Sequence, residues 1–220
     1  MSRVADVALA AILLVLLAPV FVAVACIVRL SGPGPVIYRG ARVGRGGRQF
    51  HILKFRSMRA DAPTRRDLTV AGDPRVTTLG RLLRLTKLDE LPQLVNVVRG
   101  DMALVGPRPE SPRYVAHYGP EQLAVLNVRP GITGAAQVVF AHEERLLSGP
   151  DPEAVYLDTV MPGKLAIDLE YVRRRSAWLD LRILALTLVA VVRPVRPPIE
   201  MPSPTRGRVM RMDRRGRQHG

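Results

Sequence analysis

The stretch VADVALAAILLVLLAPVFVAVACIV, which runs from Val4 to Val28, decides the fold of this chain because nearly all of it is apolar. Asp6 is its only charged residue, and the run is long enough to cross a hydrocarbon core of about 30 Å as a helix. A cleaved signal peptide fits poorly, since Asp6 stands where such peptides carry positive charge. The sequence therefore predicts a membrane element over residues 1–30.

Pro19 lies within this run and leaves two ways of placing it in a membrane. A simple spanning helix is favoured by the arginines that follow the run and would hold its C-terminal side in the cytoplasm, namely Arg29, Arg39, Arg42, Arg45 and Arg48. A proline, however, removes a backbone donor and clashes with the preceding turn, which favours a kinked or re-entrant helix with both ends cytoplasmic. Composition alone keeps both arrangements open.

A compact domain over residues 31–195 is expected to follow the membrane element. The sequence SGPGP at 31–35 ends the helix, and short strands are expected at 36–38 and 49–53, on either side of a turn at 44–47. Helical patterning returns at 77–87, 89–98, 114–126, 143–147 and 166–175. The predicted fold class is therefore α+β, mostly helical, with a short β-hairpin.

The C-terminal part of the chain divides into an apolar and a basic segment. Residues 176–192 read either as an amphipathic helix in the membrane interface, with Trp178 at headgroup depth, or as an ordinary core helix. Residues 196–220 are rich in arginine, proline, serine and glycine, so we expect a basic disordered tail that can touch lipid phosphates.

Composition narrows the classes of partner. The formal net charge of +14 over 220 residues points to phosphates, nucleic acid or an anionic membrane. Nucleic acid is disfavoured, because only 5% of the residues are aromatic and no recognised binding motif occurs. Cys26 is the only cysteine and the four histidines are widely spaced, which argues against a zinc site. Any metal would be held by carboxylates.

Asp89 and Glu90 are the acids best suited to chemistry. Neighbouring acids beside Arg84 and Lys87 would stay ionised, so they could attack phosphorus or hold Mg²⁺. A structural interpretation competes, since Asp is a preferred N-cap, Glu suits a first helical turn, and Pro92 fits the same start. The two interpretations are compatible with each other.

Several cations are candidate phosphate ligands. Lys54 and Arg56 follow the second expected strand, and Arg108 lies in a turn stiffened by two prolines. A rigidly held guanidinium can bind phosphate oxygens in bidentate fashion. Asp168 is a weaker candidate, because it could simply pair with an arginine of its own helix.

The order of five short segments makes the chain resemble the bacterial sugar transferase family, the small monotopic phosphoglycosyl transferases. The segments are KFRSM (54–58), LDELPQL (88–94), RGDM (99–102), VGPRPE (105–110) and PGITG (130–134). The resemblance covers roughly residues 1–194. It implies an enzyme on the cytoplasmic face of the bacterial inner membrane, anchored by a re-entrant helix that breaks at Pro19.

The resemblance also implies a reaction and roles for residues. Asp89 would attack the phosphate that bears the sugar of a UDP-sugar, releasing UMP, and polyprenyl (undecaprenyl) phosphate would then capture the phospho-sugar. Asp89 and Glu90 would bind Mg²⁺ as the cofactor. Phosphates would be bound by Lys54, Arg56, Arg108 and Arg129, with Asp168, Arg145 and Gln137 in support. Membrane lipid and a second copy of the chain are further expected partners.

One departure from the family pattern concerns the segment after Gly134. Ala141 stands about where the family carries an arginine thought to help with substrate phosphate. Either Arg145 or Arg129 substitutes for it, or donor binding differs. The competing hypothesis is therefore a catalytically inactive, basic membrane scaffold in a polysaccharide assembly complex.

Overall fold

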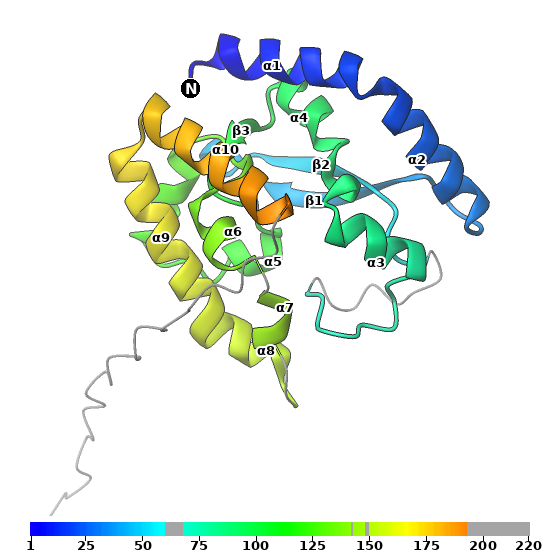
Figure 1. Cartoon of the computed structure of the whole chain (residues 1–220). Coiled ribbons are helices and arrows are strands. Elements are labelled where there is room, and N and C mark those ends of the chain that lie inside the picture. Colours follow the sequence, from blue (N-terminus) through cyan, green and yellow to red (C-terminus); the bar gives the residue numbers. More distant parts are fainter. Residues whose placement is uncertain (60–67, 142, 148–149, 193–220) are drawn as a thin grey trace, which may run out of the picture.

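A computed structural model describes residues 1–59, 68–141, 143–147 and 150–192. Helices dominate it, and two separate two-stranded sheets lie among them (Figure 1). The predicted α+β, mostly helical class is confirmed. The expected basic tail at 196–220 lies outside the described residues.

The N-terminal apolar run forms two helices instead of one. Helix α1 (Arg3–Leu16) and helix α2 (Ala18–Leu30) meet at a bend of 63°. Pro19 occupies the first turn of α2, where its missing N–H group leaves no helical hydrogen bond unmade. Among the described residues, the two helices together have the length and apolar composition of a membrane span, whereas no single helix has them.

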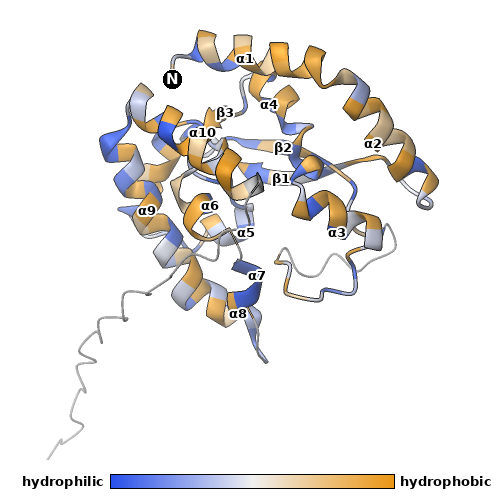
Figure 2. Cartoon of the chain, viewed as in Figure 1, coloured by the Kyte–Doolittle hydropathy of each residue, from blue (hydrophilic) through white to orange (hydrophobic). Residues whose placement is uncertain are grey.

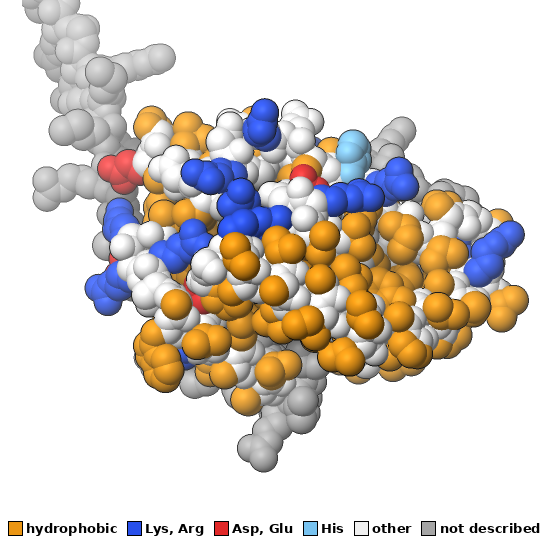
Figure 3. Space-filling model, turned by 90° about the horizontal axis from the view of Figure 1, so that it is seen from above, with side chains coloured by type: hydrophobic (Ala, Val, Ile, Leu, Met, Phe, Trp, Pro, Cys, Tyr) orange, Lys and Arg blue, Asp and Glu red, His pale blue; other side chains and the backbone are white. Residues whose placement is uncertain are grey.

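Helices α1 and α2 curve over the rest of the domain and turn a broad apolar surface outward (Figures 1 and 2). On that surface the side chains of Val4, Val15 and Leu30 are 78%, 75% and 85% exposed. Seen from above, apolar side chains cover this face and lysines and arginines gather along one edge (Figure 3). Water does not favour so large an exposed apolar patch. The face therefore marks a surface for lipid or for another apolar partner.

Strands β1 (Ile37–Val43) and β2 (Gln49–Phe55) form the expected hairpin, each a few residues longer than predicted. Asn96 of helix α4 (Gln93–Arg99) holds the free edge of β2. Its side chain donates to the His51 carbonyl at 2.8 Å and accepts from the Leu53 N–H group at 3.0 Å. This contact fixes the position of Lys54, the next residue of β2.

Thr77 is the N-cap of helix α3 (Thr78–Leu85), and its hydroxyl accepts from the Gly80 N–H group at 2.9 Å. Gly80 packs closely against the segment that follows β2, because a Cβ atom there would come within 1.8 Å of the Ser57 carbonyl oxygen. Just after helix α3, Lys87 adopts the left-handed backbone conformation, with a φ of 59°.

Asp89 and Glu90 lie on a short 3₁₀ turn, η2 (Leu88–Glu90), and not in the first turn of an α-helix. The prediction of a helix starting at Asp89 was wrong by about one turn, since α4 begins at Gln93. The hydrogen bonds from Glu90 to Lys87 and from Leu91 to Leu88 are of the tighter three-residue kind. The turn buries Asp89 and leaves the Glu90 side chain only 13% exposed.

Strands β3 (Ala103–Val105) and β4 (Gly131–Thr133) pair in parallel, and the sequence did not predict them. The strands approach closely because a Cβ atom on Gly131 would lie 2.1 Å from the Gly106 backbone nitrogen. Their side chains enter a core that includes Val97, Met102 and Tyr171. This small sheet anchors the turn that carries Arg108.

The other helical elements cover the sheets from one side. They are α5 (Pro112–Val115), η3 (Gln122–Asn127), α6 (Ala135–Val139), α7 (Glu143–Leu146), α8 (Pro152–Val155), η4 (Tyr156–Val160), α9 (Met161–Arg174) and α10 (Ala177–Val192). The helix expected at 114–126 is thus divided in two. Helix α10 buries Asp180 and Ile183 against the core, while Trp178 is 76% exposed.

Candidate functional site

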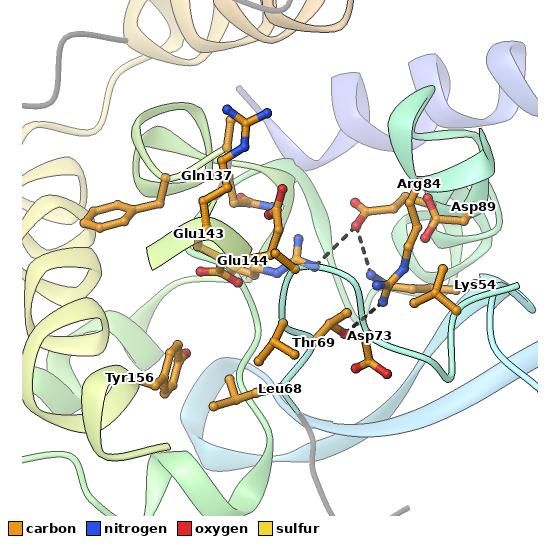
Figure 4. A pocket seen from close by; sticks show the side chains of 18 of the residues that line it. Lys54, Leu68, Thr69, Asp73, Arg84, Asp89, Gln137, Glu143, Glu144 and Tyr156 are labelled. Carbon is orange, nitrogen blue, oxygen red and sulfur yellow. Dashed lines mark hydrogen bonds and ion pairs between the residues drawn. The ribbon is translucent and has the colours of Figure 1, made fainter. Parts of the chain in front are cut away.

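A cavity of about 520 Å³ lies between the turn that carries Asp89 and the helices of the C-terminal half (Figure 4). Eight basic and six acidic residues line it. The basic ones are Arg42, Lys54, Arg81, Arg84, Lys87, Arg108, Arg145 and Lys164, and the acidic ones are Asp73, Asp89, Glu90, Glu110, Glu143 and Glu144. The cavity is therefore suited to a polar ligand that carries negative charge.

Asp89 is only 4% exposed, although it lines the cavity. Its Oδ1 atom has no hydrogen-bond partner within the described part of the chain. Burial raises the pKa of Asp89, and so does Glu90, whereas the positive charges of Lys54 and Arg84 oppose the rise. A buried carboxylate oxygen without a partner is costly unless a ligand uses it, so this atom is the best candidate for direct chemistry.

Glu90 is the centre of an ion-pair network beside Asp89. Its Oε1 atom accepts from the Lys54 ammonium at 2.9 Å and from the Arg108 guanidinium at 3.3 Å. Burial alone would raise the pKa of Glu90, but Lys54, Arg108 and Lys87 together hold it well below the usual range. Glu90 thus stays ionised and keeps two cations at fixed positions in the cavity wall.

Arg84 completes this wall, which consists of Lys54, Arg84, Asp89, Glu90 and Arg108 and is called the Asp89 wall below. The Arg84 guanidinium donates to the Thr69 hydroxyl at 3.1 Å. Burial lowers the pKa of Arg84, and the negative charge of Asp89 is the strongest effect in the opposite direction. Figure 4 shows Arg84 and Asp89 side by side. The positive charges of Lys54, Arg84 and Lys87 therefore act on the Asp89 carboxylate.

The opposite wall holds a second charge network, called the Lys164 cluster, which consists of Glu110, Glu143, Tyr156 and Lys164. The Lys164 ammonium lies 3.1 Å from Glu110 Oε1, 3.0 Å from Glu143 Oε2 and 3.4 Å from the Tyr156 hydroxyl. The Tyr156 hydroxyl donates to Glu110 Oε1 at 2.5 Å. Four separate segments of the chain converge here.

The expected phosphate-binding residues divide between the cavity and other places. Lys54 and Arg108 line the cavity, as described above. Arg56 does not: its guanidinium donates to the carbonyl oxygens of Val28, Gly32 and Pro33 at 2.5–2.8 Å and so closes the C-terminal end of α2. The spacing of the KFRSM segment gave no sign of this structural use.

Arg129 also lies away from the cavity lining, and its Nε atom donates to the Gly100 carbonyl at 3.1 Å. Arg145 lines the cavity, as does Ala141, so Arg145 is the better placed of the two candidates to replace the family arginine. Gln137 lines the cavity too, and its Nε2 atom donates to the Ile132 carbonyl at 2.9 Å.

Asp168 lies behind the cavity, 4% exposed, with its Oδ1 atom unpartnered among the described residues. Burial raises the pKa of Asp168 to about 7, and the charge of Lys164 and the backbone N–H groups of Ala136 and Arg108 oppose this. The carboxyl group therefore faces the backbone of the Arg108 turn, which is a supporting position and not one in contact with a ligand.

Sequence reasoning missed the roles of Lys164, Tyr156 and Glu110. Glu110 belongs to a quoted segment, but Lys164 lies in the middle of a helix and Tyr156 in a short π-helical turn. No spacing along the chain connects them, because only the folding of α7, η4 and α9 brings them together. Arg84 was visible only as part of the basic surroundings of Asp89.

Mg²⁺ is the cofactor that the resemblance implies. Within the described ranges no group of three or more His, Cys, Asp or Glu side chains is arranged to hold a metal ion. Asp89, with its unpartnered oxygen, and the adjacent Glu90 nevertheless fit a Mg²⁺ ion that takes its other ligands from water and substrate phosphates, as this ion commonly does.

The sequence profile of the bacterial sugar transferase family matches residues 1–194. A UDP-glucose:undecaprenyl-phosphate glucose-1-phosphate transferase from Caulobacter vibrioides is 44% identical over 87% of this chain and 69% of its own length. A protein of the same name from Xanthomonas campestris is 43% identical, over 85% of this chain and 38% of its own.

A third relative differs in the sugar that its name gives. It is a UDP-N-acetylgalactosamine-undecaprenyl-phosphate N-acetylgalactosaminephosphotransferase from Aeromonas hydrophila, 37% identical over 85% of this chain and 42% of its own length. The chain thus spans about two fifths of the Xanthomonas and Aeromonas relatives and more than two thirds of the Caulobacter one.

Proposed function

Because the chain belongs to the bacterial sugar transferase family, we propose that it moves a sugar 1-phosphate from a UDP-sugar to undecaprenyl phosphate and releases UMP. This is the reaction class that the names of its relatives state. The observation that carries the proposal is the Asp89 carboxylate, which lies in a cavity among three cations with one oxygen unpartnered. Such a site can both attract a diphosphate and attack it.

The first step forms a covalent bond to the protein. An oxygen of Asp89 attacks the phosphorus that bears the sugar, and the bond from that phosphorus to the bridging oxygen of the diphosphate breaks. UMP leaves with the bonding electron pair as a phosphate oxygen. Lys54, Arg84 and Arg108 stabilise the charge that builds up on the phosphoryl oxygens, and Glu90 holds Lys54 and Arg108 in position.

The second step returns the protein to its starting state. A phosphate oxygen of undecaprenyl phosphate attacks the same phosphorus, and the bond between that phosphorus and Asp89 breaks. The products are an undecaprenyl diphospho-sugar and the free carboxylate. A covalent intermediate divides one difficult transfer into two in-line displacements that use the same cations.

Mg²⁺ held by Asp89, Glu90 and the substrate phosphates would neutralise diphosphate charge that otherwise repels a carboxylate nucleophile. The side chains of the Asp89 wall orient the diphosphate beside it. Burial of Asp89 limits the access of water to the phospho-sugar ester.

The apolar surface of α1 and α2 supports a position at the cytoplasmic face of the bacterial inner membrane, where a polyprenyl acceptor resides. The 63° bend before Pro19 favours the re-entrant arrangement over a straight span. The basic edge beside this surface is suited to anionic lipid headgroups (Figure 3). A first membrane step in polysaccharide or glycoconjugate synthesis fits both substrates. A homodimer stays a prediction.

The experiment that tests this function is UMP release from a panel of UDP-sugars by the detergent-solubilised protein, with Mg²⁺ and undecaprenyl phosphate, compared with Asp89→Asn. Repeated turnover of one donor that depends on the acceptor, and that the substitution abolishes, is expected. No release with any donor from folded protein would favour the inactive scaffold, and restoration by Ala141→Arg would then identify the missing arginine as the cause.

A further inference from the structure

The two walls of the cavity differ in charge, and the transfer chemistry uses only one of them. The Asp89 wall supplies the nucleophile and the cations for a diphosphate. Across the cavity, Tyr156 and Glu143 face Asp89 and Lys54 (Figure 4). In the Lys164 cluster two carboxylates share one ammonium group, so the cluster itself carries a net negative charge, which Arg108 of the Asp89 wall partly offsets.

We propose that the Lys164 cluster, together with Ser111, binds the hydroxyl groups of the donor's sugar and thereby selects the sugar that is transferred. This inference rests on the proposed function and names the part of the substrate that the second wall recognises. Carboxylate oxygens accept hydrogen bonds from hydroxyls, while the serine hydroxyl can donate to them. A hexose needs both kinds of partner.

The geometry of the cluster is that of a prepared site. The Lys164 side chain is only 7% exposed, yet both Glu110 and Glu143 lie within 3.1 Å of its ammonium. Buried ion pairs rarely add stability over apolar packing, so a network of this kind at a cavity wall indicates a ligand. The Glu143 side chain remains 31% exposed and can turn an oxygen to the cavity.

Ser111 provides an independent observation. It is 4% exposed, it lines the same cavity next to Glu110, and its Oγ atom has no hydrogen-bond partner within the described ranges. Ser111 precedes helix α5, but its hydroxyl makes no capping bond there. A buried hydroxyl without a partner is satisfied when a ligand's hydroxyl group occupies the cavity.

Tyr156 fixes the position of the Glu110 carboxylate. Its ring is buried against that of Tyr114, with centroids 4.9 Å apart, so it is held in one orientation while its hydroxyl donates to Glu110. Hydrogen-bonding groups fixed in this way discriminate between sugars that differ in one hydroxyl group. Sites built to bind a particular hydroxyl reject ligands that lack it much more strongly than apolar pockets do.

The test measures binding without turnover, in protein that carries Asp89→Asn. The affinities of UDP and of a UDP-sugar, with UDP-glucose and UDP-N-acetylgalactosamine as first probes, are measured by calorimetry in the presence of Mg²⁺. We expect Glu143→Gln to weaken binding of the UDP-sugar by about tenfold or more, as loss of a bond to a charged group does, and to leave UDP binding within about twofold.

Two further variants keep the result interpretable. Tyr156→Phe removes one hydroxyl but keeps the ring, and it should also weaken only the UDP-sugar. Glu153→Gln is the matched control, because Glu153 is an acid of the neighbouring helix α8 that pairs with Arg113 and does not line the cavity. It should change neither affinity.

Binding of deoxy analogues of the sugar distinguishes direct recognition of a hydroxyl group from a purely structural role of the cluster. If Glu143 binds one hydroxyl, removing that hydroxyl costs affinity before the substitution but not after it. Equal weakening of UDP and UDP-sugar would assign the cluster to the nucleotide and overturn the proposal. Unchanged affinities, or no UDP-sugar binding at all, would overturn it too. Failure of the proposed function is seen separately, as absent UMP release when Asp89 is intact.

Discussion

Replacement of Asn96 by alanine should uncouple the β-hairpin from the helix that follows the turn carrying Asp89. The Asn96 side chain is fully buried and makes three hydrogen bonds, to the Leu53 N–H group, the His51 carbonyl and Asp101 Oδ2. The first two partners are backbone groups on the edge of β2 that faces away from β1. Without Asn96 the buried Leu53 N–H group would stay unsatisfied, and the His51 carbonyl would lose its partner.

The size of the effect follows from these two groups. The buried N–H group left without a partner costs about 1–3 kcal/mol and the lost bond to the carbonyl about 0.5–1.5 kcal/mol, so Asn96→Ala should lower the free energy of unfolding by roughly 2–5 kcal/mol. For a chain of this size that corresponds to a fall of roughly 5–15 °C in Tm. Activity should fall as well, because Lys54 follows Leu53 directly and would lose its fixed distance to Glu90.

Thermal unfolding of the detergent-solubilised protein and UMP release measure the two effects. Asp101→Ala is the matched control, since it removes only one of the three bonds and leaves both β2 groups satisfied, so its cost should be the smaller of the two. If Asn96→Ala were as stable as Asp101→Ala, the argument that Asn96 fixes the edge of β2 would be refuted.

Three other predictions follow from the same contacts. Burial raises the pKa of Asp168 to about 7, above its value in the unfolded chain, so the wild-type protein loses stability as pH rises from about 4 to 7, and the loss is complete above pH 7. The Tm of Asp168→Asn relative to wild type should therefore increase between pH 5 and pH 8. A constant difference in Tm would contradict the raised pKa. Arg56→Gln should lower Tm through the loss of its three carbonyl contacts but change the donor KM less than twofold, whereas Arg108→Gln should raise KM at least about tenfold. Gly80→Ala should destabilise the fold by several kcal/mol, since its Cβ would overlap the Ser57 carbonyl oxygen. Gly119→Ala, whose Cβ would meet no atom closer than 3.7 Å, should be tolerated in the same unfolding assay.

Those parts of the fold that depend on local pattern could be predicted from the sequence. The apolar run with its proline left a simple spanning helix and a kinked or re-entrant one open, and the bend between α1 and α2 agrees with the kinked arrangement. The hairpin followed from alternating residues around a glycine-rich turn. The parallel pairing of β3 with β4 was not predictable, because three-residue strands far apart in the chain leave no periodic signal.

The candidate site shows the same division. Asp89, Glu90, Lys54 and Arg108 stand in short ordered segments, and the structure brings all four to one cavity. Arg56 belongs to the same segment as Lys54 but is used to close α2, a choice that depends on carbonyls at 28–33. The Lys164 cluster depends on tertiary packing, so Glu143, Tyr156 and Lys164 look like ordinary helix residues in the sequence, and only Glu110 stands in a quoted segment.

The central claim, that Asp89 becomes covalently phosphorylated by the donor, is tested most directly by mixing protein and UDP-sugar with Mg²⁺ but without undecaprenyl phosphate. We predict a burst of UMP of about one equivalent per active site. Intact-mass measurement should show an added sugar phosphate, which maps to the peptide that contains Asp89, disappears on addition of acceptor and is absent in Asp89→Asn. UMP release that strictly requires the acceptor, with no adduct at any time, would contradict the covalent account and indicate direct transfer between the two substrates.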